Sequence, residues 1–166
     1  MAEKNKVFET KVKNSGVFDF KEVYSFLYTL FTDLEYSVEE KVYSEKTKGD
    51  KKEIDVTWLA KRKVSDYFRF QIKMDIKILA MSEIEVVKDG IKVKTNKGDF
   101  EMKIFAFLEK DYENRWENTA FLRFLRGIYD RYIVKSTLEG YEAQVSKEAL
   151  DLADQAKAYF SLTVAK

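Results

Sequence analysis

Residues 66–80 read DYFRFQIKMDIKILA, and apolar and polar side chains alternate along nearly the whole stretch. The apolar set is Phe68, Phe70, Ile72, Met74, Ile76 and Ile78, and the set between them is Tyr67, Arg69, Gln71, Lys73, Asp75 and Lys77. Because successive side chains of a strand point to opposite faces of a sheet, the pattern predicts a half-buried strand with a dry face and a wet face. A strand of about twelve residues is roughly twice the usual length, so we expect a sheet that bends around another element.

Shorter segments of the same kind lie on both sides of this stretch. They predict further strands at residues 7–12, 36–46, 53–61, 83–88, 91–95 and 99–108. Gly49, Gly90 and Gly98 fall between these segments, where glycine tolerates the positive φ angles of tight hairpin turns. A loop at residues 14–16 is expected after the first strand. Consecutive strands joined by tight turns form an antiparallel meander.

Three further segments have the spacing of amphipathic helices. Asp19 and Glu22 match a capping box at the start of a helix over residues 19–35. A second helix is expected over residues 111–135, and a third, after Gly140 interrupts the pattern, from about residue 141 or 146 to 162. The fold prediction is therefore an α+β protein, with a six- or seven-stranded antiparallel meander, an N-terminal helix and two C-terminal helices packed on its dry face.

This order of elements resembles the helix-grip arrangement, in which a curved antiparallel sheet wraps around a long C-terminal helix. The long strand after Asp66 is the kind of element that such a sheet needs. The helix-grip arrangement has one long final helix where this sequence predicts two. The resemblance concerns architecture alone, and architecture does not carry function.

The composition is that of a folded protein with balanced charge. The chain has 166 residues, 45% of them apolar, which predicts a single α+β domain over residues 1–166. Residues 1–12 lack the apolar segment of a secretory signal, and no apolar run approaches the roughly 18 residues of a membrane span, so we expect a cytoplasmic location. Abundant lysine and glutamate without proline or cysteine are typical of thermophile proteins, although an AT-rich genome gives a similar bias.

The sequence contains neither cysteine nor histidine. Their absence excludes disulfides, thiolate nucleophiles, sulfur-ligated metals and every catalytic triad that uses histidine. We therefore predict no catalytic, cofactor-binding or metal-binding residues, and the sequence argues against an enzyme. An enzyme based on carboxylates, lysine or tyrosine is the third hypothesis, and it requires strongly shifted pKa values.

Large apolar side chains on the dry face and the helices give the first candidate site. A cavity between the curved sheet and a helix could hold an apolar small molecule. Its predicted lining is Trp58, Phe70, Met74, Phe121 and Phe124. The alternative is a filled core, which any packed layer of sheet and helices has.

The segment around residues 115–127 gives the second candidate site. Trp116, Arg123 and Arg126 lie together on the predicted helix, away from its apolar stripe. Tryptophan and arginine are enriched at the centres of protein interfaces, so these residues predict a surface for a protein partner or for self-association. The leading hypothesis is accordingly a non-catalytic interaction or assembly module, and the alternative is a small carrier of an apolar ligand.

The wet face of the long strand is basic, which raises the question of nucleic acid. Sheet surfaces that bind single strands combine basic residues with aromatic rings. This strand offers Arg69, Lys73 and Lys77 but only one aromatic residue, Tyr67, and Asp75 interrupts the basic strip. Together with the net charge of +1, this argues against a nucleic-acid partner.

Overall fold

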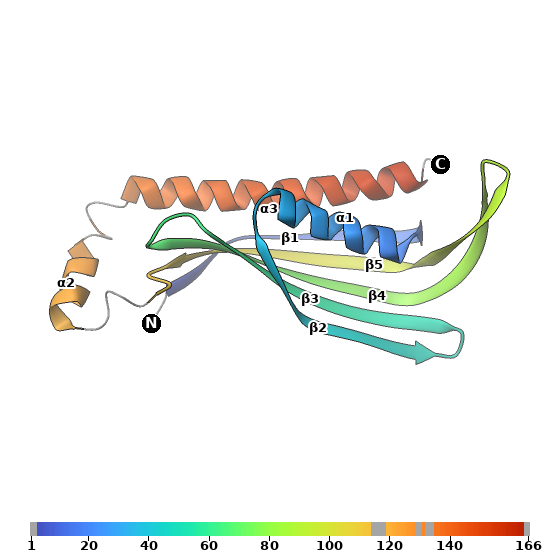
Figure 1. Cartoon of the computed structure of the whole chain (residues 1–166), viewed down its shortest axis with the longest axis horizontal. Helices are drawn as coiled ribbons and strands as arrows, with labels where there is room; N and C mark the ends of the chain where they lie inside the picture. Colours follow the sequence, from blue (N-terminus) through green and yellow to red (C-terminus); the bar gives the residue numbers. More distant parts are fainter. Residues whose placement is uncertain (1–2, 114–118, 129–130, 132–134, 165–166) are drawn as a thin grey trace.

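The structure, a computed structural model, describes residues 3–113, 119–128, 131 and 135–164. Its elements follow in the order β1 (Glu3–Phe18), α1 (Phe20–Asp33), β2 (Ser37–Lys48), β3 (Lys51–Lys63), β4 (Phe68–Lys88), β5 (Ile91–Lys110), α2 (Ala120–Ile128) and α3 (Lys135–Val164). In the described part of the chain the strands form one five-stranded antiparallel sheet in the order β1-β5-β4-β3-β2. α1 and α3 lie on the same side of this sheet (Figure 1). The α+β class, the antiparallel sheet and the order of strands and helices are as predicted.

The number of strands is smaller than predicted, because two pairs of expected strands are continuous. β4 joins the segments expected at 66–80 and 83–88, and β5 joins those expected at 91–95 and 99–108. The alternation breaks inside β4 at a bulge, where the register with β5 shifts between Leu79 and Ser82 and Ala80 has a φ of 53°. An extra residue in one strand reverses which side chains point inward, so in the sequence a bulge looks like the end of a strand.

Gly98 lies opposite this bulge, in the middle of β5, and does not form the predicted turn. It pairs with Gly16 of β1, so the loop predicted at residues 14–16 is also part of a strand. A Cβ atom at Gly98 would lie 3.0 Å from both Leu79 O and Met81 Cα, so the glycine permits the close approach of the bulged strand. The turn predicted at Asp89-Gly90 is confirmed, because both residues have positive φ, at 53° and 79°, between β4 and β5.

The start of α1 is as the sequence predicts, whereas α3 begins earlier than predicted. α1 begins where the capping box predicts, since Asp19 Oδ1 accepts a hydrogen bond of 3.1 Å from the backbone N–H of Glu22. α3 runs through Gly140 without the predicted break. A glycine inside a helix costs about 1 kcal/mol relative to alanine, and the burial of Val145 and Leu152 on the same helix outweighs this cost.

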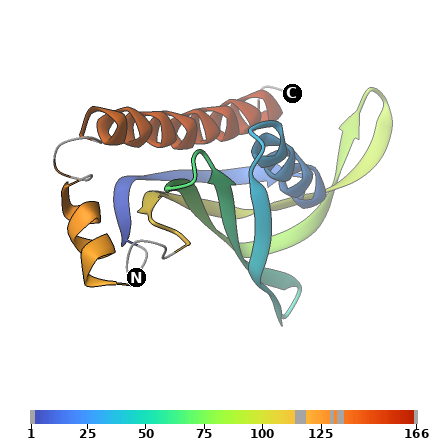
Figure 2. The same ribbon diagram turned by 60° about the vertical axis from the view of Figure 1, so that its left-hand side comes forward.

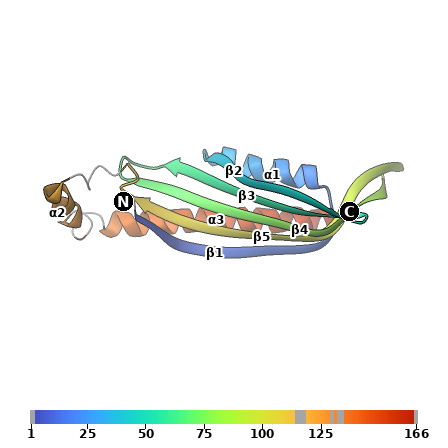
Figure 3. The same ribbon diagram turned by 90° about the horizontal axis from the view of Figure 1, so that it is seen from below.

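The core lies between the dry face of the sheet and the two helices that cover it. Trp58, Phe70 and Met74 are among its largest fully buried side chains. Ala149, Ala153 and Ala156 of α3 are also buried. Small side chains at these positions let α3 pack closely on the sheet. The view from below shows α3 running lengthwise behind the strands (Figure 3).

A polar network fixes α3 to the rest of the fold. Glu148 of α3 accepts hydrogen bonds from the Tyr36 hydroxyl at 2.6 Å and from Arg62 Nη2 at 2.8 Å. Arg62 also donates through Nη1 to the backbone oxygen of Leu34 at 2.6 Å. Burial, and then the neighbouring Glu148 carboxylate, raise the pKa of Tyr36, so its hydroxyl keeps the donated proton. The network therefore joins α3, β3 and the connection between α1 and β2.

The close approach at Gly98 gives a prediction about stability. Gly98→Ala is expected to lower the free energy of unfolding by about 1–3 kcal/mol, because the added methyl group meets backbone atoms that cannot rotate away. Gly140→Ala is the matched control, since a Cβ atom there meets nothing within 4 Å. We expect it to raise the free energy of unfolding by about 0.5–1 kcal/mol. Urea unfolding measures both, and equal effects of the two substitutions contradict the close approach.

Candidate functional site

The predicted cavity residues divide into two groups in the structure. Trp58, Phe70 and Met74 are 0–1% exposed and belong to the packed core. Phe121 and Phe124 are 65% and 63% exposed on α2, which lies off the end of the sheet (Figure 1). The prediction that these five residues line one cavity, and that the apolar face of this helix packs on the sheet, is therefore corrected. Helical spacing identifies an apolar face but does not say what that face packs against.

The polar atom of Trp58 already has a partner within the protein. Its Nε1 donates to Glu40 Oε2 at 3.2 Å, and the Tyr24 hydroxyl donates to the same oxygen. The rings of Tyr24 and Tyr28 meet the indole edge to face, with centroids at 4.9 and 6.0 Å. These contacts fill the region around Trp58 with protein side chains.

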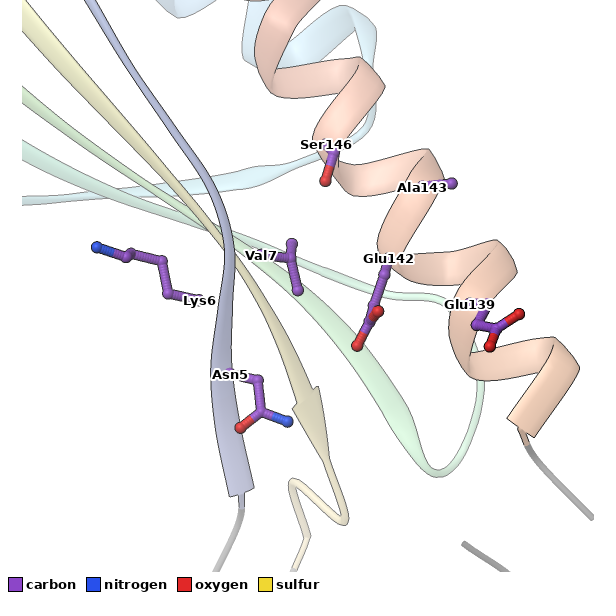
Figure 4. A pocket seen from close by; sticks show the side chains of 7 residues that line it. All are labelled: Asn5, Lys6, Val7, Glu139, Glu142, Ala143 and Ser146. Carbon is purple, nitrogen blue, oxygen red and sulfur yellow. The ribbon is translucent and has the colours of Figure 1, made fainter. Parts of the chain in front are cut away.

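An open groove lies elsewhere, between the start of β1 and the first turns of α3 (Figure 4). Its volume is about 500 Å³, and its lining is Asn5, Lys6, Val7, Glu139, Glu142, Ala143 and Ser146. Most of these side chains are polar or charged, and Glu142 and Val7 point into the space (Figure 4). The groove is thus unlike the apolar site that a carrier of an apolar ligand requires.

α2 is attached to the end of the sheet by a buried charged contact. Arg126 is only 7% exposed, its Nη1 lies 3.6 Å from Asp111 Oδ2, and its Nε donates to the Tyr67 hydroxyl at 3.2 Å. Asp111 follows β5 directly, and its backbone N–H donates to the Tyr67 carbonyl at 2.8 Å. Thr119 begins the helix, since its Oγ1 accepts from the backbone N–H of Leu122 at 3.1 Å. The contact therefore turns the side of α2 that carries Arg126 toward the protein, together with the half-buried Leu122 and Leu125.

The opposite side of α2 is apolar and faces solvent. Phe121, Phe124 and Ile128, here called the α2 face, have exposed fractions of 65%, 63% and 38%. At about 100° of rotation per residue, these three side chains lie within roughly 60° of one another around the helix axis. An amphipathic helix normally buries its apolar stripe and exposes its charged residues. α2 instead buries Arg126 and leaves these three apolar side chains exposed, while Leu122 and Leu125 are half-buried, and the helix projects from the end of the molecule (Figure 2).

The predicted partner surface has a different composition from the one that the sequence suggested. Arg123 is exposed, but Arg126 points inward to Asp111 and Tyr67. Trp116 lies outside the described residues. The structure adds Phe121, Phe124 and Ile128 to this surface, although the sequence predicts Phe121 and Phe124 as cavity lining. Their spacing was visible in the sequence, but the inward contact of Arg126 depends on residues distant along the chain.

The position of α2 gives a prediction about its local stability. Arg126→Ala is expected to raise the rate of amide hydrogen exchange in residues 120–128 about tenfold or more, because a buried hydrogen bond to a charged group is lost. Exchange in β3 and β4 is expected to stay at the wild-type rate. Arg123→Ala, which removes an exposed arginine from the same helix, is the control. Equal protection of α2 in the two variants contradicts the anchoring role of Arg126.

The Tyr24 hydroxyl gives a prediction about pH. Burial, and then the hydrogen bond to Glu40, raise the pKa of Tyr24 to about 12, whereas tyrosine in an unfolded chain titrates near about 10. The folded state holds this proton more tightly, so its contribution to stability is complete below about pH 10 and disappears as the pH rises toward 12. The unfolding free energy of Tyr24→Phe is expected to fall less over this range than that of the wild type. Parallel curves in alkaline urea titrations contradict the raised pKa.

None of the helices in the described residues combines the length and the apolarity that crossing a membrane requires. Comparison of the chain with protein families, with curated proteins and with solved structures gave no match. A function must therefore be argued from the physical properties of the surfaces themselves.

Proposed function

We propose that this protein is a non-catalytic assembly module that acts through protein contacts, and that the α2 face is its contact surface. The observation that supports this proposal is the orientation of α2, which buries Arg126 and exposes Phe121 and Phe124. Fully burying a phenylalanine side chain stabilises a protein by about 1.5–3 kcal/mol relative to leaving it in water. A partner that covers both rings therefore gains several kcal/mol that the isolated chain does not.

A second copy of this chain is the partner that fits the α2 face best. In a two-fold symmetric contact, each copy supplies the same patch, so one apolar surface is sufficient for both sides. Arg123 is separated from Phe121, Phe124 and Ile128 by more than about 100° around the helix. Two α2 faces can thus meet without bringing their exposed arginines together.

The packed core also favours a contact surface over an internal ligand site. Trp58, Phe70 and Met74 are buried against other side chains, and the open groove beside β1 is lined mainly by polar residues. Neither region resembles a site for an apolar ligand. With the interior occupied, the apolar side chains still available for binding are on the surface, and two of the three on the α2 face are the most exposed phenylalanines in the described residues.

The proposal predicts an oligomer that depends on α2. The double substitution Phe121→Ser and Phe124→Ser is expected to weaken self-association by roughly a hundredfold, because about 3 kcal/mol of apolar burial is lost. Native mass spectrometry and light scattering over a wide concentration range measure the change. The thermal stability of the monomer is expected to stay close to the wild-type value, because both rings already face solvent.

The matched control removes two exposed apolar side chains from the opposite end of the molecule. Val87 and Ile91 are 71% and 66% exposed near the β4–β5 turn, and Val87→Ser with Ile91→Ser is expected to leave the oligomer intact. If both double variants lose the oligomer, the α2 face of one copy contacts the β4–β5 turn of the next copy. Such a head-to-tail contact still uses α2. A wild-type monomer at every concentration, or an oligomer that survives the α2 substitutions, contradicts the proposal.

A further inference from the structure

Figure 3 shows the face of the sheet turned away from α1 and α3. The strand register places aromatic, amide and basic residues of this face in adjoining rows. One row crosses four strands as Lys6 of β1, Phe107 of β5, Gln71 of β4 and Lys61 of β3, and it contains no carboxylate. In the next row, Phe105 of β5 lies opposite Lys73 of β4. The outer-face cluster is defined here as Lys4, Lys61, Gln71, Lys73, Phe105 and Phe107.

Lysine ammonium groups gather around the two rings of this cluster. Lys4 Nζ lies 4.1 Å from the centroid of the Phe107 ring, and Lys73 Nζ lies 5.8 Å from that of Phe105. Burial lowers the pKa of Lys4. The negative charge of Glu109 opposes this shift, whereas the positive charges of Lys61 and Lys73 add to it. The cluster thus concentrates positive charge on a partly dehydrated surface.

The carboxylates near the cluster have partners, and one of them, Asp75, pairs with the cluster residue Lys73. Glu109 receives two hydrogen bonds from Arg69, at 2.7 and 3.0 Å. Glu9 pairs with Lys6 at 2.7 Å, and Asp75 accepts from the Thr57 hydroxyl at 2.9 Å and lies 3.6 Å from Lys73 Nζ. Among the described residues, Lys4 and Lys61 form no ion pair. Two lysines of the cluster are therefore available to an anion.

Gln71 provides a second, independent sign of a ligand. Its side chain is 2% exposed, and its Nε2 has no hydrogen-bond partner in the structure. The register places Gln71 between Phe107 and Lys61 on the outer face. Buried amide groups in folded proteins nearly always have a hydrogen-bond partner, so an unsatisfied donor at the centre of this cluster favours an acceptor supplied by a bound molecule.

We propose that the outer-face cluster binds single-stranded nucleic acid. Phe105 and Phe107 stack unpaired bases, Lys4, Lys61 and Lys73 neutralise phosphates, and the Gln71 amide donates to an acceptor on a base. Lys4 and Lys73 must first leave the rings that they cover, and their long flexible side chains allow this movement.

The spacing of the two rings favours a single strand. Phe105 and Phe107 are two residues apart on β5, which separates them by roughly 6.6 Å at about 3.3 Å per residue. This is about twice the 3.4 Å between stacked bases along one strand of a duplex. Bases that lie on both rings are therefore unstacked from each other, as the bases of an extended single strand can be. A duplex keeps its bases inside the helix and offers this surface only its backbone.

The sequence argues against this partner on three grounds, which are the single aromatic residue of the long strand, the interruption of its basic strip by Asp75, and the net charge of only +1. The aromatic residue, Tyr67, is buried and bonded to Arg126. The aromatic residues of the outer face come from β5, where Phe105 and Phe107 alternate with the core residues Ile104 and Ala106. Pairing of β5 with β4 brings these rings beside the lysines and Gln71.

Binding is tested by fluorescence anisotropy with a labelled, mixed-sequence single-stranded oligonucleotide over a range of salt concentrations. Lys61→Gln with Lys73→Gln is expected to weaken binding about tenfold or more at low salt. It is also expected to reduce the slope of log affinity against log salt by about 1.4, at roughly 0.7 for each phosphate contact. Lys88→Gln with Lys92→Gln, which removes the same charge near the β4–β5 turn, is the matched control and is expected to bind like the wild type.

A second pair of substitutions tests stacking separately from charge. Phe105→Leu with Phe107→Leu keeps apolar side chains on the outer face but removes the aromatic rings. We expect affinity to fall at least about fivefold while the salt slope stays at the wild-type value. Thermal unfolding of each variant verifies that the fold is retained.

Several results overturn the proposal. The first is the absence of salt-sensitive binding to the oligonucleotide at low salt. Equal losses in the cluster variant and in the Lys88 and Lys92 control show general charge attraction. Equal affinity for a duplex of the same sequence, or for polyglutamate, shows that the rings and the amide do not recognise unpaired bases. An oligonucleotide too short to reach two clusters makes these measurements independent of the oligomeric state, so they do not test the α2 proposal.

Discussion

The requirement to bury one apolar face of two very long strands determines the shape of this protein. β4 has 21 residues, which extend roughly 70 Å at about 3.3 Å per residue. α3 has 30 residues, which reach roughly 45 Å at about 1.5 Å per residue. The helix therefore cannot cover the whole strand pair. The bulge at Leu79–Ser82 lies where this difference has to be accommodated. Beyond it the β4–β5 hairpin extends past the C-terminal end of α3 and bends toward the side of the sheet that carries the helices, with Val87 and Ile91 exposed (Figure 1).

Buried polar contacts decide how the helices are placed on this sheet. Glu148 links α3 to Tyr36 and Arg62, and Arg126 links α2 to Asp111 and Tyr67. The two contacts have opposite consequences. In α3 the polar link accompanies a buried apolar face, whereas in α2 the polar link is on the inward side and leaves the apolar face outside. Removing one member of a buried charged contact is costly. The contact of Arg126 with Asp111 and Tyr67 therefore holds α2 in the orientation that leaves the α2 face exposed.

The sequence contains the local rules of this fold but not its long-range contacts. Strict alternation in residues 66–80 is sufficient to predict a half-buried strand, and the spacing of Asp19 and Glu22 is sufficient to predict a helix start, because both depend on neighbours. The position of Gly98 between two alternating segments predicts a turn, whereas its role in the fold depends on a bulge about twenty residues earlier. The sequence predicts Phe121 and Phe124 as cavity lining for the same kind of reason, since helical spacing says nothing about the buried contact of Arg126.

The alternation of side chains along β5 also explains how one strand can serve both stability and binding. Ile104 and Ala106 point into a core that is already filled, while Phe105 and Phe107 point to the outer face. Since β5 continues from this region to Asp111, where Arg126 holds α2, the outer-face cluster and the α2 face lie at the same end of the molecule (Figure 3). The two proposals together imply that assembly through α2 brings two outer-face clusters near each other. A single strand long enough to reach both would gain affinity through effective concentration, without any new contact.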